Sequence, residues 1–316
     1  MTETASIESI FSQSILLGIN FMCSLNLKQR RWLCAGAIAL CFGSKVLADE
    51  PDSGYLKIFV PELWENLVYQ AKAPFLMSRN QALGLGAGAL VTAGLFQVDI
   101  PVSDEARSLG LDHPWMAEVS PYISDLGGTA GILSIGGVGL FGWLADRSKE
   151  QETAYLMAQA VITSGLWCRI GKTLTARTRP SAAWNGTKYV DHWHRPLSEL
   201  KPGSGSVTQY DAFPSGHTTS FVSMLTVLSC QYGEEHPWVP IASCTATAVF
   251  GVARIVEETH WISDVFVGAC LGYLCGRQVV NHHRQKDLGS KTEESRNIIL
   301  LLPIDNGEMA FYSRAF

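Results

Sequence analysis

The sequence predicts an all-α protein, a bundle of six helices associated with a membrane. Charged residues make up 17% of the 316 residues, below the roughly 25% of typical globular domains, so much of the surface is expected to avoid water. Six apolar segments account for this deficit, and each is at or slightly under the ~20 residues that cross a bilayer. They are residues 82–97, 126–144, 154–171, 218–231, 238–253 and 265–280. Their many glycine, alanine, serine and threonine residues favour close packing between helices.

Residues 1–48 are predicted to be a leader, either a signal peptide or a retained anchor. Lys28, Arg30 and Arg31 precede the apolar run WLCAGAIALCFG, and small residues end at Ala48. This order of a charged, an apolar and a small-residue region is typical of a bacterial secretion signal.

Two further segments flank the apolar region. Residues 49–81 form a lead-in segment in which Tyr55 to Val60 reads as a short strand. Residues 286–316 form a tail, where two β-prone runs, 298–304 and 309–312, flank an Asn-Gly turn. That pattern predicts a small β-hairpin.

Charge in the connections predicts the orientation of the six segments. The 98–125 connection has six acidic residues against Arg107 alone, whereas Arg147 and Lys149 lie in the 145–153 turn and Arg284 and Lys286 in the tail. Because basic connections stay on the cytoplasmic side, the 98–125 connection is predicted to lie outside. Cleavage after Ala48 would place residues 49–81 outside as well, although six spans need them inside. Three solutions remain open: the leader is retained, one segment does not span, or the segments are core helices of a soluble secreted protein.

Three cationic residues at the ends of apolar segments are candidate phosphate ligands. Lys172 and Arg179 follow one segment in the run KTLTARTRP, and Arg254 ends another. Arginine offers a planar fork of donors and lysine a mobile point charge, so together they neutralise several phosphate oxygens.

Two histidines and a carboxylate lie close to these cations in the sequence pattern. The run PSGH, with Ser215, Gly216 and His217, opens an apolar segment. We expect it to form a turn whose backbone N–H groups bind an anion at a helix start. His260 and Asp264 are four residues apart. On one helix face the carboxylate is expected to accept the Nδ1–H and leave Nε2 free as a nucleophile.

The order K-x6-R-P, P-S-G-H and R-x5-H-x3-D resembles the signature of the type 2 phosphatidic acid phosphatase and vanadium haloperoxidase superfamily, in its lipid phosphatase branch. The resemblance extends over residues 82–285, which we therefore predict to be one phosphatase-like domain. Ala253 replaces the serine that usually precedes the arginine of the third motif. This departure predicts the loss of one phosphate contact and weaker turnover.

The resemblance implies a metal-independent phosphatase that acts through a phosphohistidine. In this scheme His260 attacks phosphorus, Asp264 supports the imidazolium and His217 protonates the leaving oxygen. No metal or cofactor is expected, and vanadate is expected to inhibit. The expected substrate is a phosphorylated lipid or isoprenoid, acted on at the periplasmic face of a bacterial cell envelope.

Other functions stay open at this stage. A secreted non-specific acid phosphatase, soluble in the periplasm, would use the same residues, and so would a vanadate-dependent haloperoxidase. A non-catalytic phospholipid-binding protein is disfavoured because His217, His260 and Asp264 are all present. A net charge of −5 gives no basic surface for nucleic acid.

Overall fold

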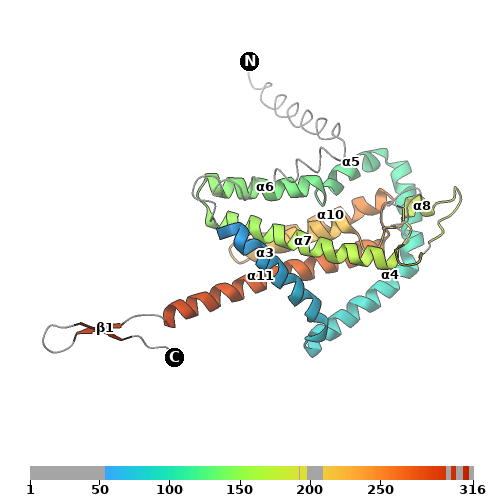
Figure 1. Ribbon diagram of the computed structural model, residues 1–316. Helices are drawn as coiled ribbons and strands as arrows, with labels where there is room; N and C mark the ends of the chain where they lie inside the picture. Colours follow the sequence, from blue (N-terminus) through green and yellow to red (C-terminus); the bar gives the residue numbers. More distant parts are fainter. Residues whose placement is uncertain (1–53, 192, 198–208, 297–299, 304–308, 313–316) are drawn as a thin grey trace, which may run out of the picture.

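The computed structural model describes residues 54–191, 193–197, 209–296, 300–303 and 309–312 as a largely helical chain (Figure 1). The predicted leader, residues 1–48, lies outside the described residues. The helices are α3 (Gly54–Lys72), α4 (Arg79–Asp112), α5 (Pro114–Asp125), α6 (Thr129–Leu144), α7 (Ser148–Thr175), α8 (Pro180–Ala183), α9 (Gly216–Tyr232), α10 (Trp238–Val256) and α11 (Ile262–Arg296), with a short 3-10 turn η1 (Ala73–Phe75). Five of the six apolar segments lie wholly inside helices, and the sixth, 126–144, is helical from Thr129 onward, so the predominantly α class is confirmed.

Helices α7, α9 and α11 form the centre of the bundle, and α11 packs most extensively against α9. Close contact between α9 and α11 depends on glycine. A Cβ atom on Gly268 would lie 2.6 Å from the Ser215 carbonyl oxygen, and one on Gly272 would lie 2.4 Å from that of Thr219. Since real Cβ atoms do not approach that closely, only glycine lets the two backbones meet here.

The number of helices suited to cross a membrane is lower than predicted. Among the described residues α4 and α10 are long and apolar enough, and α5 with α6, bent by 46°, is a third candidate. The central helix α7 falls short because it buries polar side chains, among them Gln159 and Thr163. Sequence hydropathy did not separate these inner helices from outer ones, so six spans stays a prediction.

Two local expectations were wrong. The predicted strand from Tyr55 to Val60 is part of helix α3. Its inward face places Phe59, Glu62 and Asn66 at helical spacing, and all three are buried. The predicted acidic connection 98–125 is also helical, because α4 continues to Asp112 and α5 follows directly. The helix continues through this region because Asp99 and Ser103, four residues apart, both face the protein interior. Each is 1% exposed.

The tail contains two short strands after α11. Strand β1 (Leu300–Pro303) pairs antiparallel with β2 (Met309–Tyr312), with Leu300 opposite Tyr312. Helix α11 runs to Arg296, past the predicted domain end at residue 285. Nothing in the structure tests the predicted domain boundaries.

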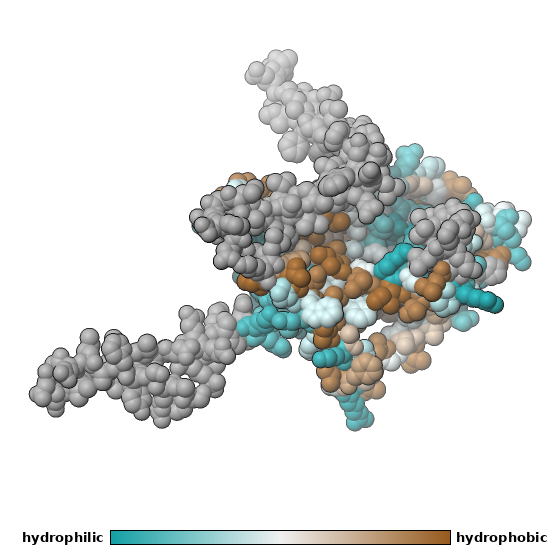
Figure 2. Space-filling view, viewed as in Figure 1, coloured by the Kyte–Doolittle hydropathy of each residue, from teal (hydrophilic) through white to brown (hydrophobic). Residues whose placement is uncertain are grey.

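Apolar side chains gather over the middle of the described bundle, and hydrophilic ones lie nearer its ends (Figure 2). On α4 the exposed apolar residues include Leu83, Leu90 and Val91, and on α10 they include Ile241 and Val249. A large exposed apolar surface bounded by polar residues is typical of a protein that contacts lipid.

Candidate active site

The three sequence motifs meet at one end of the bundle. Lys172 lies in the last turn of α7, and His217 lies in the first turn of α9. Arg254 lies in the last turn of α10, and the following turn carries His260 to the start of α11. Because α7 and α10 end where α9 and α11 begin, Lys172 and His217 line one pocket. Arg254 and His260 lie at the same end of the bundle but are not part of its lining.

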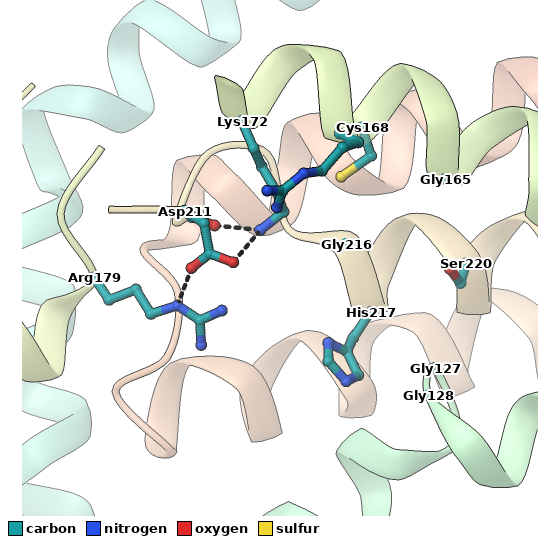
Figure 3. Close-up of a pocket in the computed structure, with 11 residues that line it drawn as sticks. Gly127, Gly128, Gly165, Cys168, Lys172, Arg179, Asp211, Gly216, His217 and Ser220 are labelled. Carbon is teal, nitrogen blue, oxygen red and sulfur yellow. Dashed lines mark hydrogen bonds and ion pairs between the residues drawn. The ribbon is translucent and has the colours of Figure 1, made fainter. Parts of the chain in front are cut away.

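Lys172 and Arg179 both face Asp211 across this pocket (Figure 3). The Arg179 Nε donates to Asp211 Oδ1 over 2.7 Å. The Lys172 Nζ lies 3.5 Å from Asp211 Oδ2 and donates to the backbone carbonyl of Asp211. Although burial would raise the pKa of Asp211, the Lys172 ammonium and the Arg179 guanidinium hold that pKa below its ordinary value. The resting pocket thus already holds one carboxylate where its cations converge.

Arg254 is buried, with 4% of its surface exposed. Its NH1 donates to Glu257 Oε2 over 2.6 Å, while its Nε has no hydrogen-bond partner in the described part of the chain. An unsatisfied donor on a buried cation is costly, so Arg254 is suited to receive an anionic oxygen.

The PSGH turn differs from the expectation in one respect. The Ser215 N–H donates to the Asp264 carbonyl oxygen over 3.0 Å, and the Ser215 hydroxyl bonds to that of Thr218. Ser215 is fully buried, so its N–H joins α9 to α11 and is not directed at the pocket. Gly216 does line the pocket, and as the first residue of α9 it presents a helix-start N–H.

His217 lines the same pocket, opposite Lys172 and Arg179 (Figure 3). The turn between α5 and α6 forms the wall beside it. A Cβ atom on Gly128 would lie 3.2 Å from the His217 ring, and one on Gly127 would lie 2.2 Å from the His217 carbonyl oxygen. Burial, together with the charges of Arg254, Lys172 and Arg179, lowers the pKa of His217 to about 3. The imidazole is therefore neutral in the empty pocket.

A backbone carbonyl group is the hydrogen-bond partner of the His260 side chain. The Nδ1 atom of His260 lies 2.8 Å from the Ala212 carbonyl oxygen and 3.7 Å from Asp264 Oδ2. Since a carbonyl oxygen only accepts, Nδ1 carries the proton and Nε2 has the free electron pair. Burial, followed by the nearby charge of Arg254, holds the pKa of His260 well below its ordinary value. The predicted tautomer is thus present, but its hydrogen bond goes to Ala212 and not to Asp264.

Asp264 is fully buried and accepts hydrogen bonds from the Arg177 guanidinium over 2.7 Å and the Trp261 N–H over 2.9 Å. Burial raises the pKa of Asp264 to about 7, and the charge of Arg177 opposes that rise. The carboxylate stays within ionic range of His260.

Sequence reasoning missed Asp211, Ala212 and Arg177. Asp211 and Ala212 are separated from the PSGH turn only by Phe213, and a carboxylate so close to a predicted phosphate-binding turn was an available signal. Arg177 lies between the two motif cations Lys172 and Arg179. Its position gave no sign that it faces away from the pocket, toward Asp264.

Among the described residues, no three histidine, cysteine, aspartate or glutamate side chains gather as a metal site. His192 lies outside the described residues. Metal independence stays a prediction.

The arrangement defines a class of protein: a helical bundle with a histidine-centred anion pocket at its end. Residues 153–287 match the family model of the PAP2 superfamily, and all three motifs lie inside that range. This part of the chain is therefore similar to the PAP2 superfamily.

A curated relative is similar over a short stretch. The lipid A 1-phosphatase of Porphyromonas gingivalis is 39% identical over 69 residues, which cover 22% of this chain and 16% of that protein. The similarity thus spans about a sixth of the relative's length.

Two solved structures are similar to the chain in part. The crystal structure of Aquifex aeolicus LpxE gives a TM-score of 0.41 at 22% identity, covering 56% of this chain and 93% of that one. The transmembrane PAP2-type phosphatidylglycerolphosphate phosphatase of Bacillus subtilis gives 0.47 at 20% identity, covering 66% and 98%.

Proposed function

We propose that this protein is a phosphatase that removes a phosphate group from a lipid through a phosphohistidine intermediate. The observation that carries the proposal is the pocket itself. It joins Lys172, Arg179 and His217, and the neighbouring His260 has its Nε2 electron pair free. A buried neutral imidazole beside several cations is suited to attack an anionic phosphorus, because the cations lower the repulsion between nucleophile and substrate.

In the first step, Nε2 of His260 attacks phosphorus and the bond from phosphorus to the leaving oxygen breaks. The leaving oxygen takes a proton from His217. That proton must arrive with the substrate, since His217 is neutral in the empty pocket; two negative charges on the phosphate would raise its pKa and favour the proton's uptake. Lys172, Arg179 and Arg254 stabilise the charge on the equatorial oxygens, together with the Gly216 N–H.

In the second step, water attacks the phosphohistidine and the P–N bond breaks. His217, now neutral, takes a proton from the water, and inorganic phosphate leaves. Positive charge on the His260 imidazole is stabilised throughout by Asp264, 3.7 Å away.

A lipid is the substrate class favoured by the surroundings of the pocket. Its volume is about 320 Å³, enough for a phosphorylated headgroup but not for acyl chains. The lining continues along α7 through Gly165, Cys168 and Arg169, and α7 exposes Leu166 and Leu174 nearby. Acyl chains would remain against that apolar surface. The lipid A 1-phosphatase relative supports the same class.

The extracytoplasmic face of a bacterial membrane is the proposed location of the pocket. Basic residues gather at the opposite end of the bundle, where Lys149 pairs with Glu235 and Arg284 donates to the Cys230 carbonyl oxygen. Because basic ends tend to remain cytoplasmic, the pocket would face outward.

The test is phosphate release by the full-length protein in detergent with EDTA, beside its His260→Ala variant. The panel contains phosphatidic acid, phosphatidylglycerol phosphate, a polyprenyl diphosphate, lipid A and a soluble phosphomonoester. Release from a lipid that disappears in the variant supports the proposal. Release only from the soluble ester would favour a secreted acid phosphatase, and equal release by the variant would refute the role of His260.

A further inference from the structure

Arg177 is the most completely bonded side chain near the pocket, and it does not line the pocket. It is fully buried. The guanidinium donates to Asp264 and Ser263 through NH1, both over 2.7 Å, and to Asp99 through NH2 over 2.7 Å. It also donates to Asp191 through NH2 over 2.6 Å and through Nε over 3.2 Å. All five N–H donors of the guanidinium thus have acceptors.

Aromatic rings enclose the same guanidinium. Its central carbon lies 5.3 Å from the ring centre of Phe96, 4.8 Å from that of Trp193 and 5.2 Å from that of Trp261. Rings at these distances attract a cation and exclude water. Arg177 is therefore held in one orientation by carboxylates at its edge and rings around it.

Asp99 connects this cluster to α4. Its Oδ1 accepts the Ser263 N–H over 3.0 Å, and its Oδ2 accepts the Ser263 hydroxyl over 2.6 Å. Asp99 is 1% exposed on a helix that otherwise exposes most of its surface. A carboxylate buried in an apolar helix needs a partner, and Arg177 and Ser263 supply it.

The charges of the cluster do not balance. One guanidinium faces three carboxylates, Asp99, Asp191 and Asp264. The excess negative charge lies close to His260, because Asp264 is 3.7 Å from its Nδ1, and none of the three carboxylates lines the cationic pocket. A positive charge that forms on the His260 imidazole is therefore stabilised by the cluster, separately from the cations that hold the phosphate.

We propose that Arg177 is a positioning residue, which together with Asp99 of α4 holds the Asp264 carboxylate ionised and aimed at His260. The proposal rests on the proposed function, because it assigns Arg177 to the same reaction. A lysine could not replace the guanidinium, because an ammonium has three donors from one point and cannot reach acceptors on four residues.

The decisive variant is Arg177→Met in the full-length protein, assayed on the lipid of the panel that wild type hydrolyses. We expect kcat to fall between about 10- and 100-fold, the range typical when a residue that orients a reacting group is lost. KM should stay within about twofold, since Arg177 does not line the pocket. Arg177→Met combined with Asp264→Asn should be no slower than Asp264→Asn alone, because both changes remove the same support.

The pH profile separates positioning from a general structural role. The charged groups that face Asp264 are Arg177, Lys172, His260 and Asp99. Without the guanidinium, the pKa of Asp264 should rise further, because the charge of Arg177 opposes the effect of burial, and more of Asp264 should be protonated at neutral pH. The kcat of Arg177→Met should therefore recover in part as pH rises, and that of Asp264→Asn should not.

Arg107→Met is the matched control, because Arg107 also ties α4 to the third motif, through Glu258 over 2.7 Å, but does not touch Asp264. It should leave the shape of the pH profile unchanged. If Arg177→Met does not fold, Arg177→Met with Asp99→Asn removes one of the carboxylates left unpaired and is expected to show the same kcat loss and recovery.

Vanadate titration of the same proteins measures, without turnover, whether the loss of Arg177 or Asp264 weakens anion binding at His260. Binding should weaken at least tenfold in Arg177→Met and in Asp264→Asn alike. Unchanged vanadate affinity and kcat in Arg177→Met, or losses that add to those of Asp264→Asn, would overturn the proposal. Absence of phosphate release by wild type would instead count against the proposed function, and the vanadate titration would still decide the role of Arg177.

Discussion

Replacing Arg254 by methionine should reduce both stability and activity, and the structure allows the two effects to be separated. Arg254 has 5% of its side chain exposed and its partner Glu257 has 10%. Methionine keeps most of the volume but removes the charge and the donors. The Glu257 carboxylate is then left with one described side-chain partner, the Thr259 hydroxyl at 3.3 Å.

Breaking a buried ion pair by removing one partner typically costs about 3–5 kcal/mol, because the other charge stays buried without compensation. At roughly 2–4 °C per kcal/mol for a domain of about 150–250 residues, the melting temperature should fall by roughly 6–20 °C. Glu257→Gln added to Arg254→Met removes the uncompensated charge. The double variant should therefore recover most of the lost stability.

Activity should behave differently. Loss of one donor that stabilises an oxyanion lowers kcat about 10²–10³-fold, and neutralising Glu257 does not replace that donor. The assay is thermal unfolding in detergent beside phosphate release at saturating lipid, for wild type, both single variants and the double variant. Near wild-type turnover in the double variant would show that Arg254 acts only through its ion pair, and would refute its role at the phosphate.

Three further results are expected. Lys172→Met and Arg179→Met should each lower kcat/KM more than tenfold, because each removes a charge that stabilises the transition state. Rates within twofold of wild type in both variants would refute the assignment of this pocket as the phosphate site. In the folded protein the pKa of His217 is lowered from its ordinary value of 6.5 to about 3. Below pH 6.5 the unfolded chain therefore takes up the proton first. The stability should fall as the pH falls toward 3, by up to about 1.4 kcal/mol per pH unit. His217→Gln should show a shallower loss of melting temperature between pH 7 and pH 4, and parallel curves would contradict this pKa. Vanadate should inhibit phosphate release and EDTA should not; bromide oxidation supported by vanadate would instead indicate a haloperoxidase.

Patterns in the sequence were sufficient for the helical class and for the residues that gather at one end of the bundle. Long apolar segments rich in small residues predicted helices because only regular hydrogen bonding satisfies such backbones. Lys172, Arg179, His217, Arg254 and His260 were predicted from residue type and spacing, and the structure brings them to one end of the bundle. These residues come together in the fold because each motif occurs where an apolar segment begins or ends.

The limits of the prediction are equally specific. Tyr55 to Val60 is rich in β-prone residues, and only packing against α7 and α11 shows that Phe59 and Glu62 share one helix face. The Ser215 N–H was predicted to face phosphate, but α11 approaches so closely at Gly268 that the Asp264 carbonyl oxygen accepts it. Such contacts join residues about fifty positions apart, and no local pattern records them.

By itself, the sequence determined which groups are available: two histidines, a carboxylate and cations at or near helix ends, since these depend on residue type and local spacing. Tertiary structure alone decided which acceptor each donor reaches. The Ala212 carbonyl oxygen selects the His260 tautomer, Asp211 occupies the cation cluster, and Arg177 turns from the pocket to join Asp99 and Asp264. The physical reason is that a buried hydrogen bond depends on distance and direction between segments, and these are defined only once the helices have packed.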